Sequence, residues 1–235
     1  MLSLDRLVCA AGSFQLSADF GVATGRSVAL IGPSGAGKST LLNTIAGFLP
    51  AVSGQMFWDG QALGPLAPGK RPLAMLFQDG NLFPHLSVER NVALGLSPRR
   101  PASPDLQDQT AQALERVGLA GFGSRSPATL SGGQQSRVAL ARILVQRRPL
   151  ILLDEPFAAL GPALKGDMLD LVADLTRAQG ATLLMITHDP DDARRIADES
   201  IVVAEGQASA PRPTPEVLDN PPAVLQEYLA APKKG

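Results

Sequence analysis

The stretch GPSGAGKST, Gly32 to Thr40, directly follows the apolar run SVALI and directly precedes a segment with a helical pattern. It satisfies the pattern GxxxxGKS, in which glycines let backbone N–H groups close around phosphate oxygens. Lys38 can reach the outer phosphates, and the Ser39 hydroxyl can ligate Mg²⁺. A plain glycine-rich turn is the alternative, but the lysine, the serine and both flanks are in register. The stretch therefore predicts a nucleoside triphosphate site, formed by Gly32, Pro33, Ser34, Gly35, Ala36, Gly37, Lys38, Ser39 and Thr40.

Polar residues follow three further apolar runs. LILL, residues 150–153, ends in Asp154 and Glu155, while Gln78 follows AMLF and His188 follows the run that ends at Thr187. Taken alone, the acidic pair would be a strand cap, and neither Gln78 nor His188 would carry a strong signal. Because the carboxyl ends of parallel strands meet at one edge of a sheet, we expect these residues beside the phosphate loop. There Asp154 could support Mg²⁺ and Glu155 could polarise an attacking water.

The hydrophobic pattern predicts an α/β core with a helical insertion. Short strand candidates lie between Gly54 and Phe77, and residues 86–148 form the helical block. The tail, residues 207–235, is rich in proline and leaves room for one or two short helices. The other predicted strands are 2–8, 14–22, 27–31, 150–154, 182–186 and 200–204, and the other predicted helices are 38–47, 162–178 and 190–197.

Composition argues against nucleic acid as a partner. Among 235 residues, 21 Lys and Arg balance 22 Asp and Glu, so no general basic field exists. The longest apolar runs fall far short of the roughly 20 residues that span a bilayer, so we expect any membrane role to come through a partner. Asp5 and Arg6 stand where a secretion leader would need apolar residues, and the lone Cys9 favours a reducing compartment.

Five elements occur in a fixed order: the phosphate loop, Gln78, LSGGQ at residues 130–134, LILLDE at residues 150–155, and His188. In this order they resemble the ATP-binding subunits of ABC transporters, and the resemblance covers almost the whole chain. It implies one domain over residues 1–235, with an ABC-type P-loop NTPase core, an inserted helical subdomain and an N-terminal antiparallel β part. ATP and Mg²⁺ are the implied cofactors.

The resemblance also implies roles for the strand-end residues. Gln78 would sense and ligate Mg²⁺, together with Ser39 and Asp154. Glu155 would activate water, and His188 would contact the γ-phosphate, which makes the chain an ATPase.

LSGGQ receives its role from the same resemblance. Alone, its serine and glycines would more simply be a helix cap. In the family, two subunits face each other head to tail, and each LSGGQ closes on the ATP held by the other. The four residues Ser131, Gly132, Gly133 and Gln134 would thus be half of a site. The implied partners are a second copy of the chain and membrane-spanning permease subunits.

Longer stretches, such as IAGFLPAVSG and RPLAMLFQDGNLFPHLSVERNVALGL, are similar to the ATP-binding subunits of bacterial thiamine importers. This implies that ATP hydrolysis energises thiamine uptake from a peripheral position on the cytoplasmic face of the inner membrane. A periplasmic substrate-binding protein would be an indirect partner. Subunits that import iron, polyamines, sulfate or molybdate share much of this sequence and stay open as alternatives.

The chain departs from the family at three places. The family usually carries an aromatic residue near the N-terminus that stacks on adenine, and ungapped alignment places Cys9 at that position. The stacking residue is therefore missing or displaced. Phe14 is the nearest substitute, although a role in the core is favoured for it. In FAALGPAL, Gly161 stands where an aspartate usually links the two sites. Ser136 replaces a common glutamine, which we interpret as tolerated surface variation.

Two other functions are compatible with parts of the sequence. A non-transport ABC ATPase, acting in DNA repair, chromosome structure or translation, would generally carry long insertions or basic surfaces. Only 53 positions separate Gln78 from Ser131, and the charge is balanced. A regulatory protein that binds ATP without hydrolysing it is suggested by Gly161 and the missing aromatic. Both rank below the transporter ATPase.

Overall fold

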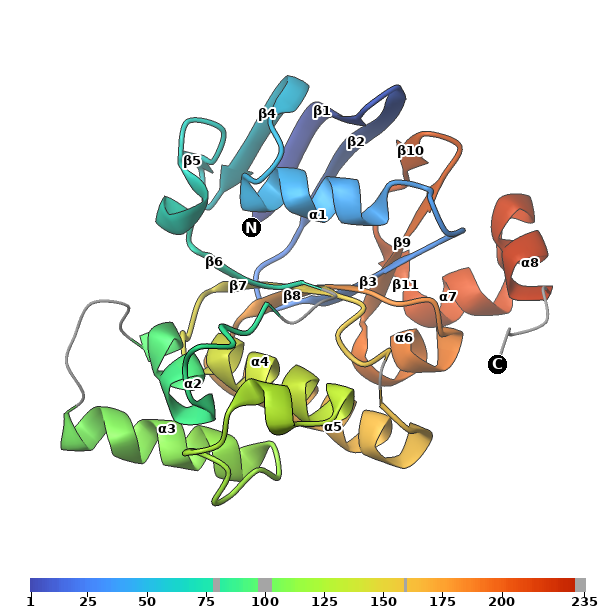
Figure 1. Ribbon diagram of the computed structural model, residues 1–235. Helices are drawn as coiled ribbons and strands as arrows, with labels where there is room; N and C mark the ends of the chain where they lie inside the picture. The colour runs from blue at the N-terminus through green and yellow to red at the C-terminus, as the bar shows by residue number, and fades with distance from the viewer. Residues whose placement is uncertain (78–80, 97–102, 159, 231–235) are drawn as a thin grey trace.

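The computed structural model describes residues 1–77, 81–96, 103–158 and 160–230. Figure 1 shows a twisted sheet with helices on both of its faces. The described strands form one path in the order β5-β4-β1-β2-β10-β9-β3-β8-β7-β6, and β11 pairs with β9. The α/β architecture predicted from the sequence is confirmed.

One half of this path is a parallel sheet. Its strands are β3 (Ser27–Ile31), β6 (Leu73–Leu76), β7 (Leu150–Asp154), β8 (Thr182–Ile186) and β9 (Glu199–Ala204). Every residue of β7 and β8 is buried, as expected for strands covered on both faces. The parallel pairing of β3, β7 and β8 brings their carboxyl ends to one edge.

The other half is antiparallel. It contains β1 (Leu2–Ala11), β2 (Phe14–Val22), β4 (Ala51–Trp58) and β5 (Gln61–Ala62). The short β10 (Gln207–Ala208) joins the halves, being antiparallel to β9 and parallel to β2, and β11 (Arg212–Pro213) lies beside β9. The proline-rich tail thus contributes two strands that the sequence did not predict.

Strand β4 also differs from the expectation, since it begins at Ala51 and runs through Gly54. The pairing of β1 with β4 shifts register between Asp5 and Val8, where Arg6 has a φ of 45°. The Gly54 backbone passes close to the Arg6 carbonyl at this bulge. Gly54 therefore accommodates a bulge rather than ending a strand.

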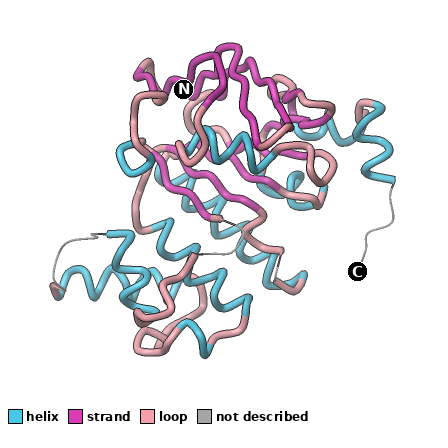
Figure 2. Tube along the Cα trace, turned by 45° about the horizontal axis from the view of Figure 1, so that its top comes forward, coloured by secondary structure: helices cyan, strands magenta, loops and turns pink. Residues whose placement is uncertain are grey.

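Helix α1 (Lys38–Ala46) lies between the parallel sheet and the antiparallel strands (Figures 1 and 2). Helices α2 (Val88–Leu96), α3 (Pro104–Arg116), α4 (Gly132–Leu144) and α5 (Pro162–Gln179) lie on the opposite side of the parallel sheet. Helices α6 (Pro190–Ile196), α7 (Thr214–Asp219) and α8 (Ala223–Ala230) gather near the C-terminus, and short 3-10 turns occur at Pro68–Lys70 and Pro127–Thr129. The interpretation of residues 86–148 as a separate subdomain stays a prediction.

Alternating residues of one strand serve two cores. Leu150 and Leu152 of β7 pack on the side of α1 and the antiparallel strands. Ile151 and Leu153 pack on the side of α2 to α5. A third, smaller cluster joins Ala29 and Ile31 of β3 to residues of α6, α7 and α8. Among the described residues, the helices are too short or too polar to cross a membrane.

Candidate nucleotide site

The phosphate loop connects β3 to α1. Helix α1 begins after Gly37, which has a φ of 95° and provides no side-chain cap. The first-turn N–H groups of α1 are therefore left to an external acceptor, as anion-binding helices require. A Cβ atom on Gly37 would lie 2.5 Å from Cε1 of Phe14, so the loop backbone rests directly on this ring. Only glycine fits at this point.

Lys38 is a buried cation, with 7% of its surface exposed. Its Nζ donates hydrogen bonds to the carbonyl oxygens of Gly32 at 2.7 Å and Pro33 at 2.8 Å. Burial lowers the pKa of Lys38, and the negative charges of Glu155 and Asp154 oppose this. The ammonium group is thus held at the loop by neutral acceptors, which phosphate oxygens can replace.

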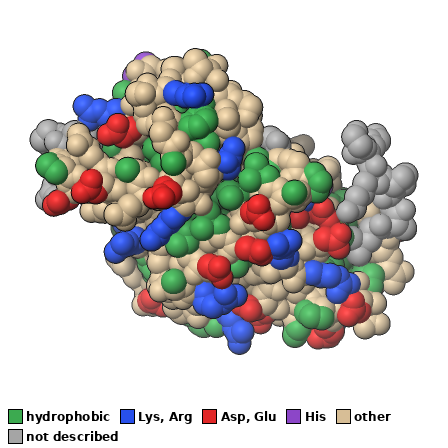
Figure 3. Space-filling model, turned by 90° about the horizontal axis from the view of Figure 1, so that it is seen from below, with side chains coloured by type: hydrophobic (Ala, Val, Ile, Leu, Met, Phe, Trp, Pro, Cys, Tyr) green, Lys and Arg blue, Asp and Glu red, His purple; other side chains and the backbone are tan. Residues whose placement is uncertain are grey.

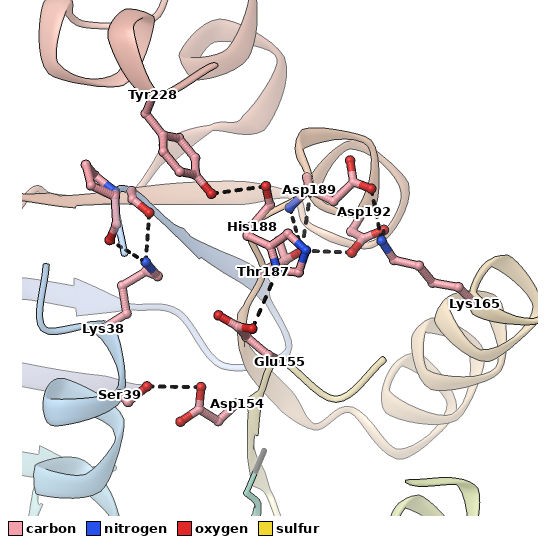
Figure 4. A network of polar contacts seen from close by, with 12 residues as sticks. Lys38, Ser39, Asp154, Glu155, Lys165, Thr187, His188, Asp189, Asp192 and Tyr228 are labelled. Carbon is pink, nitrogen blue, oxygen red and sulfur yellow. Dashed lines mark hydrogen bonds and ion pairs between the residues drawn. The ribbon is translucent and has the colours of Figure 1, made fainter. Parts of the chain in front are cut away.

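Ser39 and Asp154 meet across the site. The Ser39 Oγ donates a hydrogen bond to Oδ1 of Asp154 at 3.1 Å (Figure 4). Asp154 is almost fully buried, and burial raises its pKa, while the bond from Ser39 acts in the opposite direction. A buried carboxylate and a hydroxyl are hard oxygen ligands suited to Mg²⁺, which takes few protein ligands and completes its shell with phosphates and water. The residues present fit this ion.

The described residues contain no cluster of three or more His, Cys, Asp or Glu side chains that could hold a metal by themselves.

Glu155 and His188 lie beside this pair, at the ends of β7 and β8. Nδ1 of His188 is 3.5 Å from Oε2 of Glu155, and the two side chains are 55% and 26% exposed, respectively. Glu155 adopts a left-handed backbone with a φ of 46°, an unfavourable conformation for a residue with a Cβ. Its N–H donates to the Ile186 carbonyl, which holds the Glu155 backbone beside the end of β8. Such a pair can orient and deprotonate a water molecule.

Further residues surround His188 that the sequence did not single out. Lys165 of α5 forms ion pairs with Asp189 at 2.9 Å and Asp192 at 2.7 Å. Tyr228 of α8 donates a hydrogen bond to the His188 carbonyl. The acidic run DPDD after His188 indicates that a cationic side chain, here Lys165, lies nearby. No local sequence pattern predicts the contact of Tyr228 with His188.

The LSGGQ segment lies elsewhere. Helix α4, which begins just after Ser131, is on the opposite side of the sheet from α1 (Figure 1). Ser131 Oγ accepts from the Gln134 N–H at 3.3 Å, and Gln134 Oε1 accepts from the Ser131 N–H at 2.9 Å. Ser131 and Gly132 are exposed, and Gly133 is half-buried. The fold thus brings Lys38, Ser39, Asp154, Glu155 and His188 together but leaves LSGGQ apart.

The three departures from the family have distinct surroundings. Cys9 is fully buried in β1, where burial raises the pKa of its thiol and a hydrogen bond to Thr44 opposes this. Phe14 is half-buried and packs both on the core and on the phosphate loop. Gly161 occupies the N-cap position of α5 and has no side chain to cap the helix. The Ser136 hydroxyl donates a hydrogen bond to the Gly132 carbonyl. Gln78, also predicted for the site, lies outside the described residues.

Two curated relatives match the chain over nearly its whole length. The chain is 59% identical over 231 residues to the thiamine import ATP-binding protein ThiQ of Ruegeria sp. (strain TM1040), covering 98% of this chain and 100% of that protein. It is 55% identical over 229 residues to ThiQ of Cereibacter sphaeroides, with 97% and 99% covered.

A solved structure, the dimeric post-hydrolysis state of the ATP-binding cassette MJ0796 bound to ADP and Pi, has a TM-score of 0.81 and 28% identity to the chain. The match covers 91% of this chain and 99% of that one. Residues 16–158 match the family model described as ABC transporter. The phosphate loop, the acidic strand end and these matches agree, and the chain belongs to the ABC transporter family.

Proposed function

We propose that the chain is the ATP-binding and ATP-hydrolysing subunit of an ABC importer that carries thiamine. The observation that carries ATP hydrolysis is the adjacency of two pairs at one strand edge, Ser39 with Asp154 and Glu155 with His188. Thiamine as the substrate is supported by the relatives that bear this name at 59% and 55% identity over nearly the whole chain.

Each residue receives a role from its surroundings. The loop from Gly32 to Thr40 and the open first turn of α1 bind the phosphates, and Lys38 exchanges its carbonyl partners for phosphate oxygens. Ser39 and Asp154 would hold Mg²⁺ from their positions at the loop, and the family resemblance adds Gln78 as a further ligand. When bound, this ion neutralises charge on the phosphate oxygens.

Glu155 is placed to orient the attacking water and accept its proton, and His188 to contact the γ-phosphate. The left-handed backbone at Glu155 and the adjacent imidazole support this division of roles.

LSGGQ completes the site of a second copy of the chain. Residues Ser131, Gly132, Gly133 and Gln134 present the N-terminus of α4 to the partner's ATP, where its partial positive charge stabilises the phosphates. The dimeric form of the MJ0796 neighbours supports this arrangement. ATP closes the dimer, and hydrolysis opens it. Permease subunits would convert this motion into transport at the cytoplasmic face of the inner membrane, supplied by a periplasmic binding protein.

The hydrolysis assignment is tested with Glu155→Gln. We expect ATPase activity to fall about a hundredfold or more, since general-base catalysis is worth about 10² to 10⁴ in rate, while Mg²⁺-dependent ATP binding persists. Glu115→Gln, the same change at an exposed position of α3, is the matched control and should leave the rate unchanged. Undiminished activity of Glu155→Gln would reject the role of this carboxylate.

The substrate is tested in vesicles that contain the reconstituted complex with its binding protein. Thiamine is expected to stimulate ATP hydrolysis and to accumulate inside, whereas iron, spermidine, sulfate and molybdate should do neither. Stimulation by one of these instead would overturn the thiamine assignment and leave the ATPase assignment intact.

A further inference from the structure

The segment from Thr187 to Asp192, which carries His188, is fixed on one side by charges. The Thr187 Oγ1 donates to Oδ2 of Asp192 at 2.8 Å and accepts from the Asp189 N–H at 3.1 Å. Lys165 of α5 bridges Asp189 and Asp192. Burial opposes the charge of Lys165, but the hydrogen bonds and charges of the two aspartates leave its pKa raised. These contacts hold the segment where it enters α6.

The other side of the segment is held from the C-terminal part of the chain. The Tyr228 hydroxyl donates a hydrogen bond to the His188 carbonyl oxygen at 3.1 Å, across 40 residues of sequence. Figure 4 shows the Tyr228 ring reaching from α8 toward His188, opposite Lys165. Burial raises the pKa of Tyr228, and the negative charges of Glu155 and Asp189 raise it further. The phenol therefore stays protonated, and it lies in the field of the Glu155 carboxylate.

Helix α8 provides a fixed support for this hydroxyl. Leu225 is fully buried in the cluster that joins α6, α7 and β3, and Tyr228 packs against the same cluster. An ion pair between Arg194 and Asp219, 2.6 Å apart, further ties α6 to α7. The position of the Tyr228 ring is thus set by packing.

The His188 imidazole depends on its backbone. Its side chain is 55% exposed, so packing does little to place it, and its approach to Glu155 at 3.5 Å depends on where the backbone holds its Cα. We propose that Tyr228 is a positioning residue for ATP hydrolysis, which holds the His188 carbonyl and thereby aims the imidazole toward Glu155 and the γ-phosphate. Helix α8 is then part of the hydrolytic apparatus. The inference rests on the proposed role of His188.

Tyr228→Phe tests this idea, because it keeps the ring and its packing and removes only the hydroxyl. In the assembled transporter we expect kcat to fall about fivefold, the equivalent of one ordinary hydrogen bond, with little change in KM for ATP. Combined with His188→Ala, the same change is expected to cause no further loss, since the imidazole it positions is gone.

Spectroscopy gives a second readout in the isolated full chain. The chain has two histidines, His85 and His188, so their ring resonances are readily assigned. Tyr228→Phe should shift the His188 resonance and leave that of His85 in place. Thr214→Val is the matched control, because it removes another buried hydroxyl of the C-terminal part, which is bonded to Ser200 at 2.9 Å. This variant should lower Tm without moving kcat or the His188 resonance.

The outcomes distinguish a failure of the positioning role of Tyr228 from a failure of the role of His188. An unchanged kcat and His188 resonance in Tyr228→Phe overturn the inference, and so does an equal loss of kcat in the His188→Ala background, which indicates a general structural effect. If His188→Ala itself leaves kcat unchanged, the proposed role of His188 fails, and the positioning role falls with it.

Discussion

At the phosphate loop, α1 begins without a side-chain cap and is surrounded by buried charges, whereas at LSGGQ, α4 begins with a complete capping box on an exposed surface. Lys38 and Asp154 both have pKa values displaced by burial toward their neutral forms. Ser131 and Gln134 are neutral and satisfy each other's backbone N–H groups. Two helix N-termini with similar glycine-rich sequences thus differ in capping and in charge: that of α1 is uncapped among buried charges, and that of α4 is capped by neutral side chains.

The difference has a physical meaning. Buried charges without a ligand are costly, so the phosphate loop stores an unfavourable energy that a bound nucleotide and metal would relieve. The LSGGQ segment is stable by itself and gains little within its own subunit. This contrast suits a site composed of two subunits. In such a site the phosphate loop of one subunit binds the nucleotide first, and LSGGQ of the other subunit then closes on it.

The largest expected effect tests whether the halves belong to different subunits. Lys38→Ala and Ser131→Arg should each reduce ATPase activity about a hundredfold as homodimers, since each removes a phosphate-stabilising group. An equimolar mixture should regain about a quarter of the wild-type rate, because half of its two-fold symmetric dimers become mixed and each of these keeps one intact site. A mixture no more active than the separate variants would contradict the shared site.

A second prediction concerns the cost of the buried carboxylate. Because the folded-state pKa of Asp154 lies above its ordinary 3.8, the folded protein loses stability as pH rises through that raised value. Asp154→Asn should therefore stabilise the nucleotide-free protein at neutral pH, abolish this part of the pH dependence, and weaken stabilisation by Mg²⁺ and ATP. Thermal unfolding between pH 4 and pH 8 measures this, with the exposed Asp108→Asn as control. Equal Mg²⁺-ATP stabilisation in Asp154→Asn and wild type would refute it.

The capping box at the start of α4 is tested by Ser131→Ala. Because the N-cap is lost, this change should lower the free energy of unfolding of the nucleotide-free protein by about 1 kcal/mol. Ser131→Thr, which keeps the hydroxyl, should retain most of that energy. Urea unfolding of the nucleotide-free protein provides the measurement. Wild-type stability of Ser131→Ala would mean that the capping box contributes nothing.

The smallest effect is expected at Gly161, the uncapped residue before α5. Its backbone is extended, and a Cβ there would meet open space. Gly161→Asp should stabilise the protein by a few tenths of a kcal/mol through a new N-cap, whereas Gly161→Ala should destabilise it slightly. Calorimetry of the two variants side by side decides this, and an order of stability opposite to the expected one would exclude the capping explanation.

Much of the site was predictable because its signals are local. The start of α1 at Lys38 and the buried strands β7 and β8 follow from short apolar runs and their flanks. The burial of Cys9 was less accessible, because a bulge near Arg6 changes which β1 residues face the core. A bulge depends on the partner strand, and no pattern within β1 announces it.

The sequence by itself determined the order of the chemical groups and the elements that carry them, since phosphate loops, caps and buried strands are specified by residues within one or two turns of each other. The strand-end rule also predicted that Asp154 lies beside the phosphate loop, where it meets Ser39 across 115 positions. Only the tertiary structure decided the contacts of Phe14 under Gly37 and of Tyr228 with the His188 carbonyl. These contacts arise from the packing of whole elements, whose relative positions depend on long-range burial rather than on neighbouring residues.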